Sequence, residues 1–364
     1  MSLTVVEARS QFQADRAHYE SLGAIFNGAQ SYLPDSVRRN YNLAFDAMPS
    51  LGTDPNAGLL AIMSTFVDAQ VYEWVFAPNK ATDIMGEVKK GDWLTDQAAF
   101  PVVEATGEVS SYGDWNNNGR AGINVNWPMF QPYNFQTIME YGEREMERYG
   151  LGKINYVSEI EKSSALVMNK YRNYTYFFGV SGLQNYGLIN NPYLAAALTP
   201  ATKAAGGTSW YTSGTITATA NEIFNDIQAV FTALVVQNAG NVDRETPMVL
   251  ALSPQSEAAL TTTNSFNVNV SDLLKKNFPN MKIISAVQYQ ALSASNPQGV
   301  AGGNFMQLIA KSIEGQETGY CAYNEKMRTG AIVKDLSAFR QKAMGGSFGT
   351  ILRMPVAISS MLGI

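Results

Sequence analysis

The stretch that most limits how this chain can fold runs from Tyr112 to Trp127 and reads YGDWNNNGRAGINVNW. A turn rich in Asn and Gly separates two runs of strand-forming residues, FPVVEATGEVSSY before it and INVNWPMFQPYNF after it. In the second run Val125 and Trp127 are separated by Asn126, and this alternation has the period of a β-strand. The pattern therefore predicts a long β-hairpin.

This hairpin has too few aliphatic residues to form a core of its own. The region from residue 88 to 135 is rich in β-formers but has few of the aliphatic clusters needed to close a domain. Because an isolated two-stranded hairpin is marginally stable in water, we expect the hairpin to need a partner surface.

The small proportion of charged residues also favours extensive contacts with other chains. Only 16% of the 364 residues are charged, against roughly 25% in a typical soluble protein. The cores of protein interfaces are depleted in charge and enriched in aromatic residues. The net charge of −5 provides no overall basic field that would indicate nucleic-acid binding.

Several classes of site are disfavoured by the rarity of their residue types. The chain has a single cysteine, Cys321, and a single histidine, His18. Most zinc sites need several His or Cys ligands. A serine or cysteine nucleophile activated by histidine needs that histidine inside the folded site. The single cysteine excludes an internal disulfide. No apolar run is long enough to span a bilayer, and the first residues lack a secretory signal. We expect no cofactor, no metal and no membrane contact.

The first quarter of the chain has two parts of different composition. Residues 1–55 are predicted to form an arm, since they are rich in Asn, Asp, Pro and Ser and bury too little apolar surface to fold alone. Residues 58–75 are strongly apolar and are predicted to pack in a core.

Two long helices have clear sequence signals. The stronger signal covers residues 153–178, where apolar residues recur at spacings of three and four, and Gly179 follows as a stop. The second covers residues 220–239, preceded by a capping box made of Thr219 and Glu222.

Short elements alternate in the last third of the chain. Between residues 241 and 325, PMVLALS, MKIISAV and FMQLIAK are predicted strands, and VSDLLKKNF is a predicted helix. Ser253 caps another short helix with Pro254 at its first position. This part is predicted to be an α/β or α+β unit, and residues 326–364 are predicted to be β-strands.

Gly345–Gly349 matches the G-x-S-x-G nucleophile elbow of α/β-hydrolases. That machinery needs an acid and a histidine after the serine, and no histidine follows. A bend or bulge in a strand is the favoured interpretation.

The charge run from Glu140 to Arg148 offers paired carboxylates of the kind that glycosidases use. Glu143 and Glu147 are four residues apart on a predicted helix, as are Arg144 and Arg148. This spacing favours solvated or inter-subunit ion pairs.

The order of these elements, with the segments FAPNKATDIMGEVKKGDW, YGDWNNNGRAGINVNW, VSDLLKKNFPNMKII and ILRMPVAISSML, resembles the major capsid proteins of tailed bacteriophages. The resemblance covers nearly the whole chain and implies an α+β, HK-97-like capsid fold. The implied division is an N-terminal arm (1–55), a first part of the peripheral domain (56–87), an extended loop formed by the β-hairpin (88–135), a second part of the peripheral domain with a spine helix at 153–178 and a helix leading into the axial domain (136–240), the axial domain (241–325), and a closing β-segment of the peripheral domain (326–364).

The resemblance implies a structural protein that self-assembles through pentamers and hexamers into an icosahedral shell. The shell would enclose double-stranded DNA without reading its sequence, and it would be assembled in the host cytoplasm as part of a virion. Implied partners are other copies of the chain, a portal, decoration proteins and a separate scaffold, if any. Two alternatives remain open: an encapsulin-type nanocompartment shell and a carboxylate-dependent enzyme acting on polysaccharides.

In that family the extended loop lies on a neighbouring subunit, and Asn116–Gly122 would form its tip, with the two tryptophans as anchors. The residues implied as inter-subunit contacts are Tyr112, Asp114, Trp115, Asn117, Arg120 and Trp127, and those implied in inter-subunit ion pairs are Glu143, Arg144, Glu147 and Arg148. Some relatives form covalent Lys–Asn cross-links. Lysine is absent from 100–135, and Lys89 and Lys90 lie at the base of the loop, so we expect no cross-link.

Overall fold

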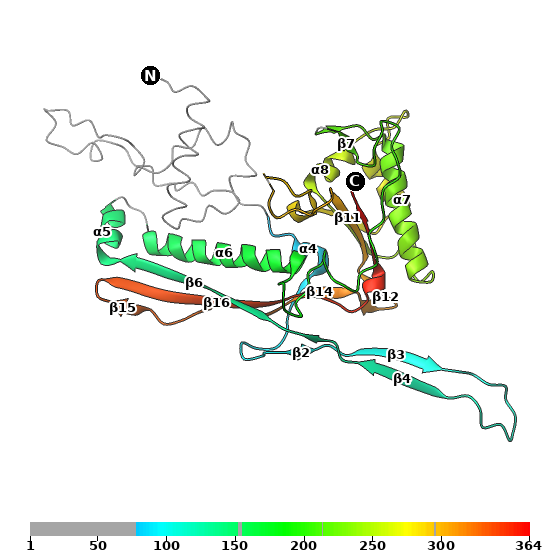
Figure 1. Ribbon diagram of the computed structural model, residues 1–364, viewed down its shortest axis with the longest axis horizontal. Helices are drawn as coiled ribbons and strands as arrows, with labels where there is room; N and C mark the ends of the chain where they lie inside the picture. Colours follow the sequence, from blue (N-terminus) through cyan, green and yellow to red (C-terminus); the bar gives the residue numbers. More distant parts are fainter. Residues whose placement is uncertain (1–77, 152–154, 213, 295) are drawn as a thin grey trace. The chain divides into compact units, whose positions relative to one another are not determined.

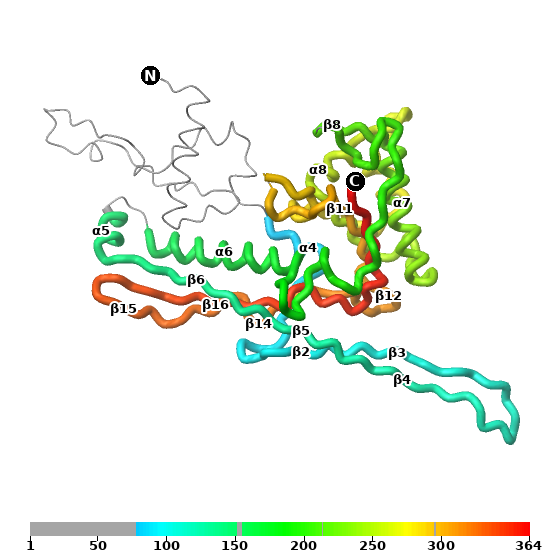
Figure 2. The backbone as a smooth tube through the Cα atoms, in the orientation of Figure 1, coloured from blue at the N-terminus to red at the C-terminus, as the bar shows by residue number. Residues whose placement is uncertain are grey.

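The structure is a computed structural model that describes residues 78–151, 155–212, 214–294 and 296–364. The predicted arm at 1–55, the apolar segment at 58–75 and His18 lie outside the described residues. Residues 79–292 and 298–364 form one unit, which contains two main sheets (Figures 1 and 2).

The first sheet is long and mostly antiparallel. Its strands in spatial order are β1 (Glu87–Lys89), β14 (Gly319–Thr329), β16 (Ala338–Leu352) and β15 (Val333–Asp335), with β6 (Tyr133–Gly142) also paired along β16. Helix α6 (Tyr156–Phe178) lies along β6 and β16 (Figure 1).

Helix α6 confirms the strongest helix prediction. Asn155 caps its first turn by accepting a hydrogen bond from the Ser158 amide. Its buried Met168 packs with Met139 of β6 and Ala343 of β16. Gly179 ends the helix with a φ of 63°, and a Cβ at that position would lie 2.2 Å from the carbonyl oxygen of Asn185. Only glycine fits this close approach.

Strand β16 contains the G-x-S-x-G segment, and the predicted bulge is confirmed. The pairing of β14 with β16 shifts register between Ala322 and Tyr323, opposite Gly349 and Ser347. Gly349 has a φ of 74°, and Ser347 is completely buried. The serine hydroxyl accepts hydrogen bonds from the Thr175 hydroxyl and from the Gly349 amide, so it is a structural residue rather than an exposed nucleophile.

The second sheet has a core layer on each face. Its strands in order are β10 (Met281–Ser285), β9 (Met248–Leu252), β11 (Phe305–Ala310) and β17 (Ile358–Leu362). Every residue of β9 is buried, with Leu250 in one core cluster and Val249 in another. A strand buried on both faces is typical of a central strand covered by helices.

The helices of this second sheet are α7 (Ala220–Gln237), α8 (Pro254–Ala259) and α9 (Val270–Asn277). The predicted capping box of Thr219 and Glu222 is present in full at the start of α7. Ser253 caps α8 with Pro254 in its first turn. These local signals were confirmed because each one depends on residues within a single turn.

The segment 326–364, grouped as one closing β-segment in the sequence, is divided between the two sheets. Its strand β16 belongs to the long sheet, whereas β17 pairs with β11 in the second sheet. The sequence pattern missed this because strand partners far apart in the chain leave no local signal. The division of the chain into peripheral and axial domains remains a prediction.

The remaining elements are short. They are α4 (Ala81–Met85), β2 (Ala98–Ala99), β3 (Val102–Gly107), β4 (Ala121–Asn126), β5 (Met129–Phe130), α5 (Glu143–Leu151), β7 (Tyr211–Thr212), β8 (Thr215–Ile216), η2 (Val287–Tyr289), β12 (Ser312–Ile313), β13 (Gln316–Glu317) and η3 (Pro355–Ala357).

The thiol of Cys321 is fully buried beside the Ala81 carbonyl and the Thr350 hydroxyl, each 3.7 Å from its sulfur. Burial disfavours the thiolate and raises the pKa of Cys321 from 9.0 to about 12. The unfolded chain therefore loses this proton first, so stability that is present below pH 9 is lost as the pH rises toward 12.

We expect the folded subunit to resist thiol reagents at pH 8, since the thiolate is the reactive form. Chemical denaturation at several pH values between 8 and 9.5 is expected to show that Cys321→Ala loses less stability with rising pH than the natural sequence does. Equal pH slopes for the two proteins, or rapid labelling of native Cys321, would contradict this account.

Candidate inter-subunit surface

The predicted hairpin is present and is formed by β3 and β4, which pair antiparallel with each other (Figures 1 and 2). The turn is larger than expected. It runs from residue 108 to 120, and Gly122, predicted at the tip, lies within β4 opposite Thr106. The predicted tip at Asn116–Gly122 was therefore placed too late and made too short.

Hydrogen bonds from polar side chains to the backbone stabilise this wide turn. Asn116 donates from Nδ2 to the Ser111 carbonyl at 2.6 Å, and its Oδ1 accepts from the Asn118 amide at 3.0 Å. Ser110 donates from its hydroxyl to the Asn118 carbonyl at 2.9 Å. Asn and Ser side chains commonly satisfy turn backbone in this way, so the Asn-rich run supports a loop rather than a two-residue turn.

The register of the hairpin separates an apolar face from a polar one. Val103 lies opposite Val125, and Ala105 lies opposite Ile123. Directly opposite residues of an antiparallel pair share a face, and side chains two apart along a strand do so too. These four residues, Val103, Ala105, Ile123 and Val125, are called the apolar hairpin face below.

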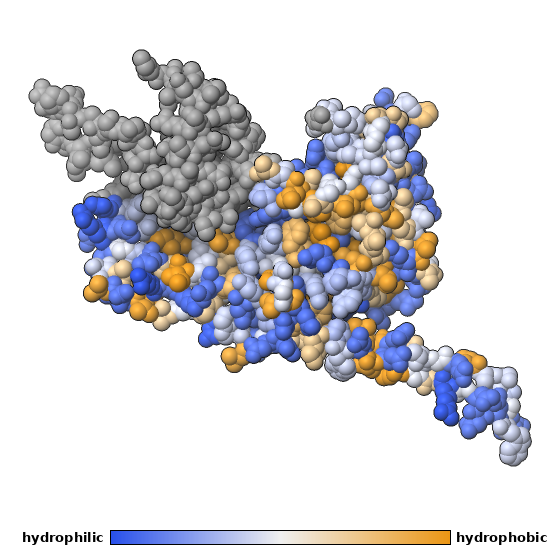
Figure 3. Space-filling view, viewed as in Figure 1, coloured by the Kyte–Doolittle hydropathy of each residue, from blue (hydrophilic) through white to orange (hydrophobic). Residues whose placement is uncertain are grey.

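The other face is mainly polar: it carries Glu104 opposite Asn124, Thr106 opposite Gly122, and Val102 opposite Asn126. All residues of both strands are exposed. The exposed fractions of Val103, Ile123 and Val125 are 59%, 67% and 43%. Figure 3 shows apolar side chains gathered over the strands that Figure 1 labels β3 and β4, with more hydrophilic ones toward the turn. An uncovered apolar face on a protruding element indicates a binding surface.

An aromatic cluster fixes the base of the hairpin. Phe100 precedes β3 and Phe130 ends β5, and their rings meet edge to face with centroids 5.5 Å apart. Phe100 also meets Tyr320 of β14 and Phe348 of β16, at 6.5 and 6.4 Å. Edge-to-face pairs add stability beyond that of buried area. The hairpin therefore starts from a rigid base on the long sheet.

The residues expected from the sequence to make contacts do not form one cluster. Tyr112, Asp114, Trp115, Asn117 and Arg120 lie in the turn, whereas Trp127 follows β4 at the base end. Within the turn the Tyr112 hydroxyl donates to Asp114 at 2.8 Å. The exposed fractions of Tyr112, Trp115 and Trp127 are 94%, 99% and 58%, so all three rings are accessible to a partner. Their role as contacts remains a prediction.

The sequence pattern missed the members of the apolar hairpin face other than Val125. The alternation that marked Val125 and Trp127 extends back to Ile123 and was the available signal. Val103 and Ala105 could not be assigned to this face without the strand register.

The charge run between Glu140 and Arg148 is divided between a strand and a helix. Glu140 lies in β6 and pairs with Arg340 of β16 at 3.0 Å, so it is not on the predicted helix. Glu143 begins α5 and pairs with Lys334 of β15 at 2.5 Å. Both carboxylates thus have cationic partners within the chain.

The other residues expected in ion pairs, Arg144, Glu147 and Arg148, are exposed on α5, and inter-subunit ion pairs there remain a prediction. The carboxylates of Glu140 and Glu143 are both about half exposed, which differs from the buried acid that glycosidases use.

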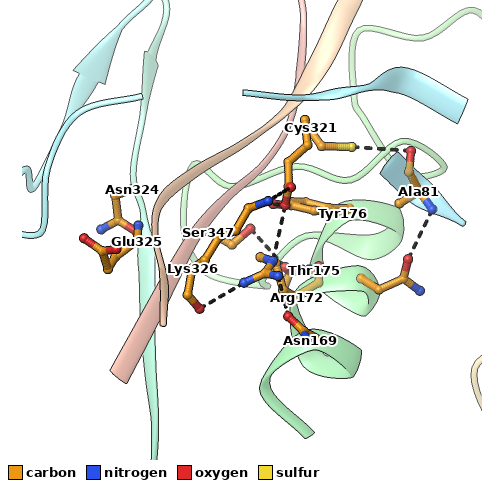
Figure 4. A network of polar contacts seen from close by, with 12 residues as sticks. Ala81, Asn169, Arg172, Thr175, Tyr176, Cys321, Asn324, Glu325, Lys326 and Ser347 are labelled. Atoms are coloured by element: carbon orange, nitrogen blue, oxygen red, sulfur yellow. Dashed lines mark hydrogen bonds and ion pairs between the residues drawn. The ribbon is translucent and has the colours of Figure 1, made fainter. Parts of the chain in front are cut away.

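The most buried charges of the long sheet hold it to α6 (Figure 4). Glu87 of β1 lies 3.4 Å from the Arg172 guanidinium and accepts a hydrogen bond from the Tyr176 hydroxyl at 2.9 Å. Lys326 of β14 also contacts the Glu87 carboxylate. Arg172 donates in addition to the Lys326 carbonyl and to Asn169. Burial and the Glu87 charge raise the pKa of Tyr176, so the phenol stays a neutral donor.

Within the described residues, no group of three or more His, Cys, Asp or Glu side chains is placed to hold a metal ion. Among those same residues, no helix combines the length and apolarity that crossing a membrane requires.

Solved structures of phage and phage-like capsids share this fold. The capsid protein of Myoviridae phage XM1 matches with a TM-score of 0.67 at 13% identity, covering 85% of this chain and all (100%) of that one. The capsid of an empty GTA particle gives 0.53 at 10% identity, covering 84% and 98%. Gordonia phage Cozz gives 0.52 at 12% identity, covering 87% and 97%. At such identities these matches establish the HK-97-like fold.

No curated protein matches the sequence. The family described as Pa193 gp26 major capsid protein matches residues 50–363, which includes both sheets, α6 and the hairpin. The protruding hairpin, the α+β fold and this match agree with one another. The chain therefore belongs to the Pa193 gp26 major capsid protein family and is a structural protein of the shell of a tailed phage.

Proposed function

We propose that this protein assembles through pentamers and hexamers into an icosahedral shell, with the apolar hairpin face of each subunit buried on the next copy. The observation that carries this proposal is a hairpin in which every strand residue is exposed and most apolar side chains share one face. A monomer gains nothing from such a face, whereas a neighbouring copy can complete its core.

The contact between hairpin and neighbour is heterologous, because the hairpin of one copy meets a different surface of the next. Contacts of this kind close into rings when the rotation between copies permits it. Burying the remaining exposed area of Val103, Ile123 and Val125 would contribute about 2–5 kcal/mol per copy. Since each subunit makes such contacts on several sides, weak contacts add up to a stable container.

The proposed cargo is double-stranded DNA held without sequence recognition. A chain with a net charge of −5 tolerates a polyanion nearby because mobile cations screen the repulsion within about 10 Å. A portal, decoration proteins, a separate scaffold if one is used, and assembly in the host cytoplasm belong to the same proposal. We propose no catalytic role for the shell subunit.

Electron microscopy of the purified recombinant protein tests the assembly. We expect closed shells, and a lone monomer at high concentration with an ordered hairpin would contradict the proposal. Particles from infected cells distinguish the cargo. Nuclease-protected DNA is expected, whereas a single packaged enzyme would indicate an encapsulin-type compartment, the alternative that the family match disfavours.

We expect mature shells to give a single monomer band on a denaturing gel. The lysines nearest the hairpin already have partners within the chain: Lys89 lies 3.5 Å from Glu325, and the Lys90 ammonium lies 5.3 Å from the centre of the Tyr320 ring. The turn itself contains no lysine. A ladder of covalent multimers that survives boiling in reductant would refute this expectation.

A further inference from the structure

Helix α7 presents a face to solvent that carries no charge. It is the main helix beside the second sheet, and its buried side contributes Ile223, Ile227 and Val230 to the core. The exposed residues of α7, called the neutral face below, are Asn221, Asn225, Gln228, Ala229, Thr232 and Val236. Val236, near the end of the helix, is 73% exposed.

The absence of charge extends beyond the helix. Between residues 204 and 242 the only charged residues are Glu222 and Asp226, and both are engaged within the chain. Glu222 accepts from the Thr219 and Ala204 amides at 2.8 and 2.7 Å. Asp226 is buried and pairs with Lys203. Both carboxylates of this segment are thus held by partners within the chain, and the exposed residues of α7 itself are uncharged.

The neighbouring helix α9 shows that this is not a general property of the second sheet. It packs against α7 through an edge-to-face contact between Phe231 and Phe278, with ring centroids 4.8 Å apart. Although α9 is less than half as long, it exposes Asp272, Lys275 and Lys276. The outer face of an amphipathic helix carries charged or polar residues. That of α9 is charged, whereas that of α7 has polar residues but no charge.

We infer that the neutral face of α7 is buried against a second copy of this chain in the assembled shell, an inference that rests on the function proposed above. Interface cores are depleted in charge, and the amide and hydroxyl side chains of this face can exchange hydrogen bonds with another uncharged surface. A second copy is the occupant because a shell subunit must contact its copies. DNA is disfavoured because phosphate binding requires cationic side chains.

Two double substitutions with the same change of net charge test this contact. Asn225→Asp with Gln228→Glu adds two carboxylates to the neutral face and keeps side-chain shape and helix propensity. Lys275→Gln with Lys276→Gln changes the net charge equally, but on the charged face of α9. We expect the first variant to reduce the yield of shells at least tenfold, because burying unpaired carboxylates at a contact is costly, and the second to change it less than twofold.

Thiol labelling provides a measurement that does not depend on assembly yield. Cys321 is buried, so Ala229→Cys on a Cys321→Ala background supplies the reactive thiol. Maleimide is expected to label it at least tenfold more slowly in intact shells than in dissociated subunits. A cysteine at Lys276, on the same background, should react at similar rates in both.

The outcomes separate this inference from the proposed function. If the natural protein forms no shells, the proposed function fails. If shells form, and the Asn225→Asp, Gln228→Glu variant assembles normally with position 229 fully reactive in them, the neutral face is not a contact between copies, and the proposed function stands.

Discussion

Replacing Ile123 with lysine is expected to prevent shell assembly while leaving the subunit folded. Ile123 is 67% exposed and lies on the apolar hairpin face opposite Ala105. If that face is buried on a neighbour, the substitution loses about 1–2 kcal/mol of apolar burial and forces a charge into an apolar contact at a cost of several kcal/mol more. Every subunit of a ring carries the defect, so the losses add around it.

The adjacent residue provides the control. Asn124 lies on the polar face opposite Glu104, so Asn124→Lys introduces the same charge one residue away and can pair across the strands. We expect its shells to form normally, as judged by sedimentation velocity and electron microscopy. Compared as unassembled subunits, both variants should unfold within about 0.5 kcal/mol of the natural sequence, as surface substitutions usually do. Normal shells from Ile123→Lys would rule out burial of this face.

The difference between Ile123 and Asn124 shows how much of the hairpin could be predicted from the sequence alone. The period of two in 124–127 predicted a strand. Which residues of the preceding strand share the apolar side depends on register, and a shift of one residue would reverse it. The register follows from the length of the turn, which the Asn-rich run made longer than expected through contacts such as Asn116 with Ser111.

Helix signals were more reliable than strand signals because they depend on residues close together in the chain, whereas strand pairing does not. The capping box of Thr219 and Glu222 and the Ser253–Pro254 start are complete within four residues, and both appear in the structure as predicted. The partners of β17 and β6, in contrast, lie far away in the chain. The resemblance to the capsid family predicted the fold correctly because it depends on the order of the elements along the chain. It does not depend on knowing which strands pair.

Two buried ionic groups among the described residues stabilise different parts of the unit. Glu87, Arg172 and Lys326 connect β1, α6 and β14 in the long sheet, and Lys326 still has half of its side chain exposed. Lys203 and Asp226 have side chains only 1% and 3% exposed. A charge buried to that extent is tolerated only with its partner in place, so the second pair should be the more sensitive to substitution.

Replacing Asp226 with asparagine is accordingly expected to destabilise the subunit by about 3–5 kcal/mol, the usual cost of leaving a buried charge unpaired. The carboxylate of Asp226 on α7 accepts from the Lys203 ammonium at 2.5 Å and from the Trp210 indole at 2.7 Å. Asparagine can still accept from Trp210 but cannot neutralise Lys203. The loop that precedes α7 should therefore loosen together with the helix.

A second substitution at the same site distinguishes an unpaired charge from a general packing defect. Lys203→Met combined with Asp226→Asn removes the buried ammonium and keeps an acceptor for Trp210, so it should recover most of the lost stability. Denaturant unfolding should be measured in the Ile123→Lys background, because assembly otherwise adds its own free energy to the subunit's stability. If the double variant is as unstable as Asp226→Asn alone, the cost does not come from the uncompensated lysine. Recovery would instead show that the ion pair fixes the loop to α7, and with it the helix whose neutral face is proposed to meet the next copy.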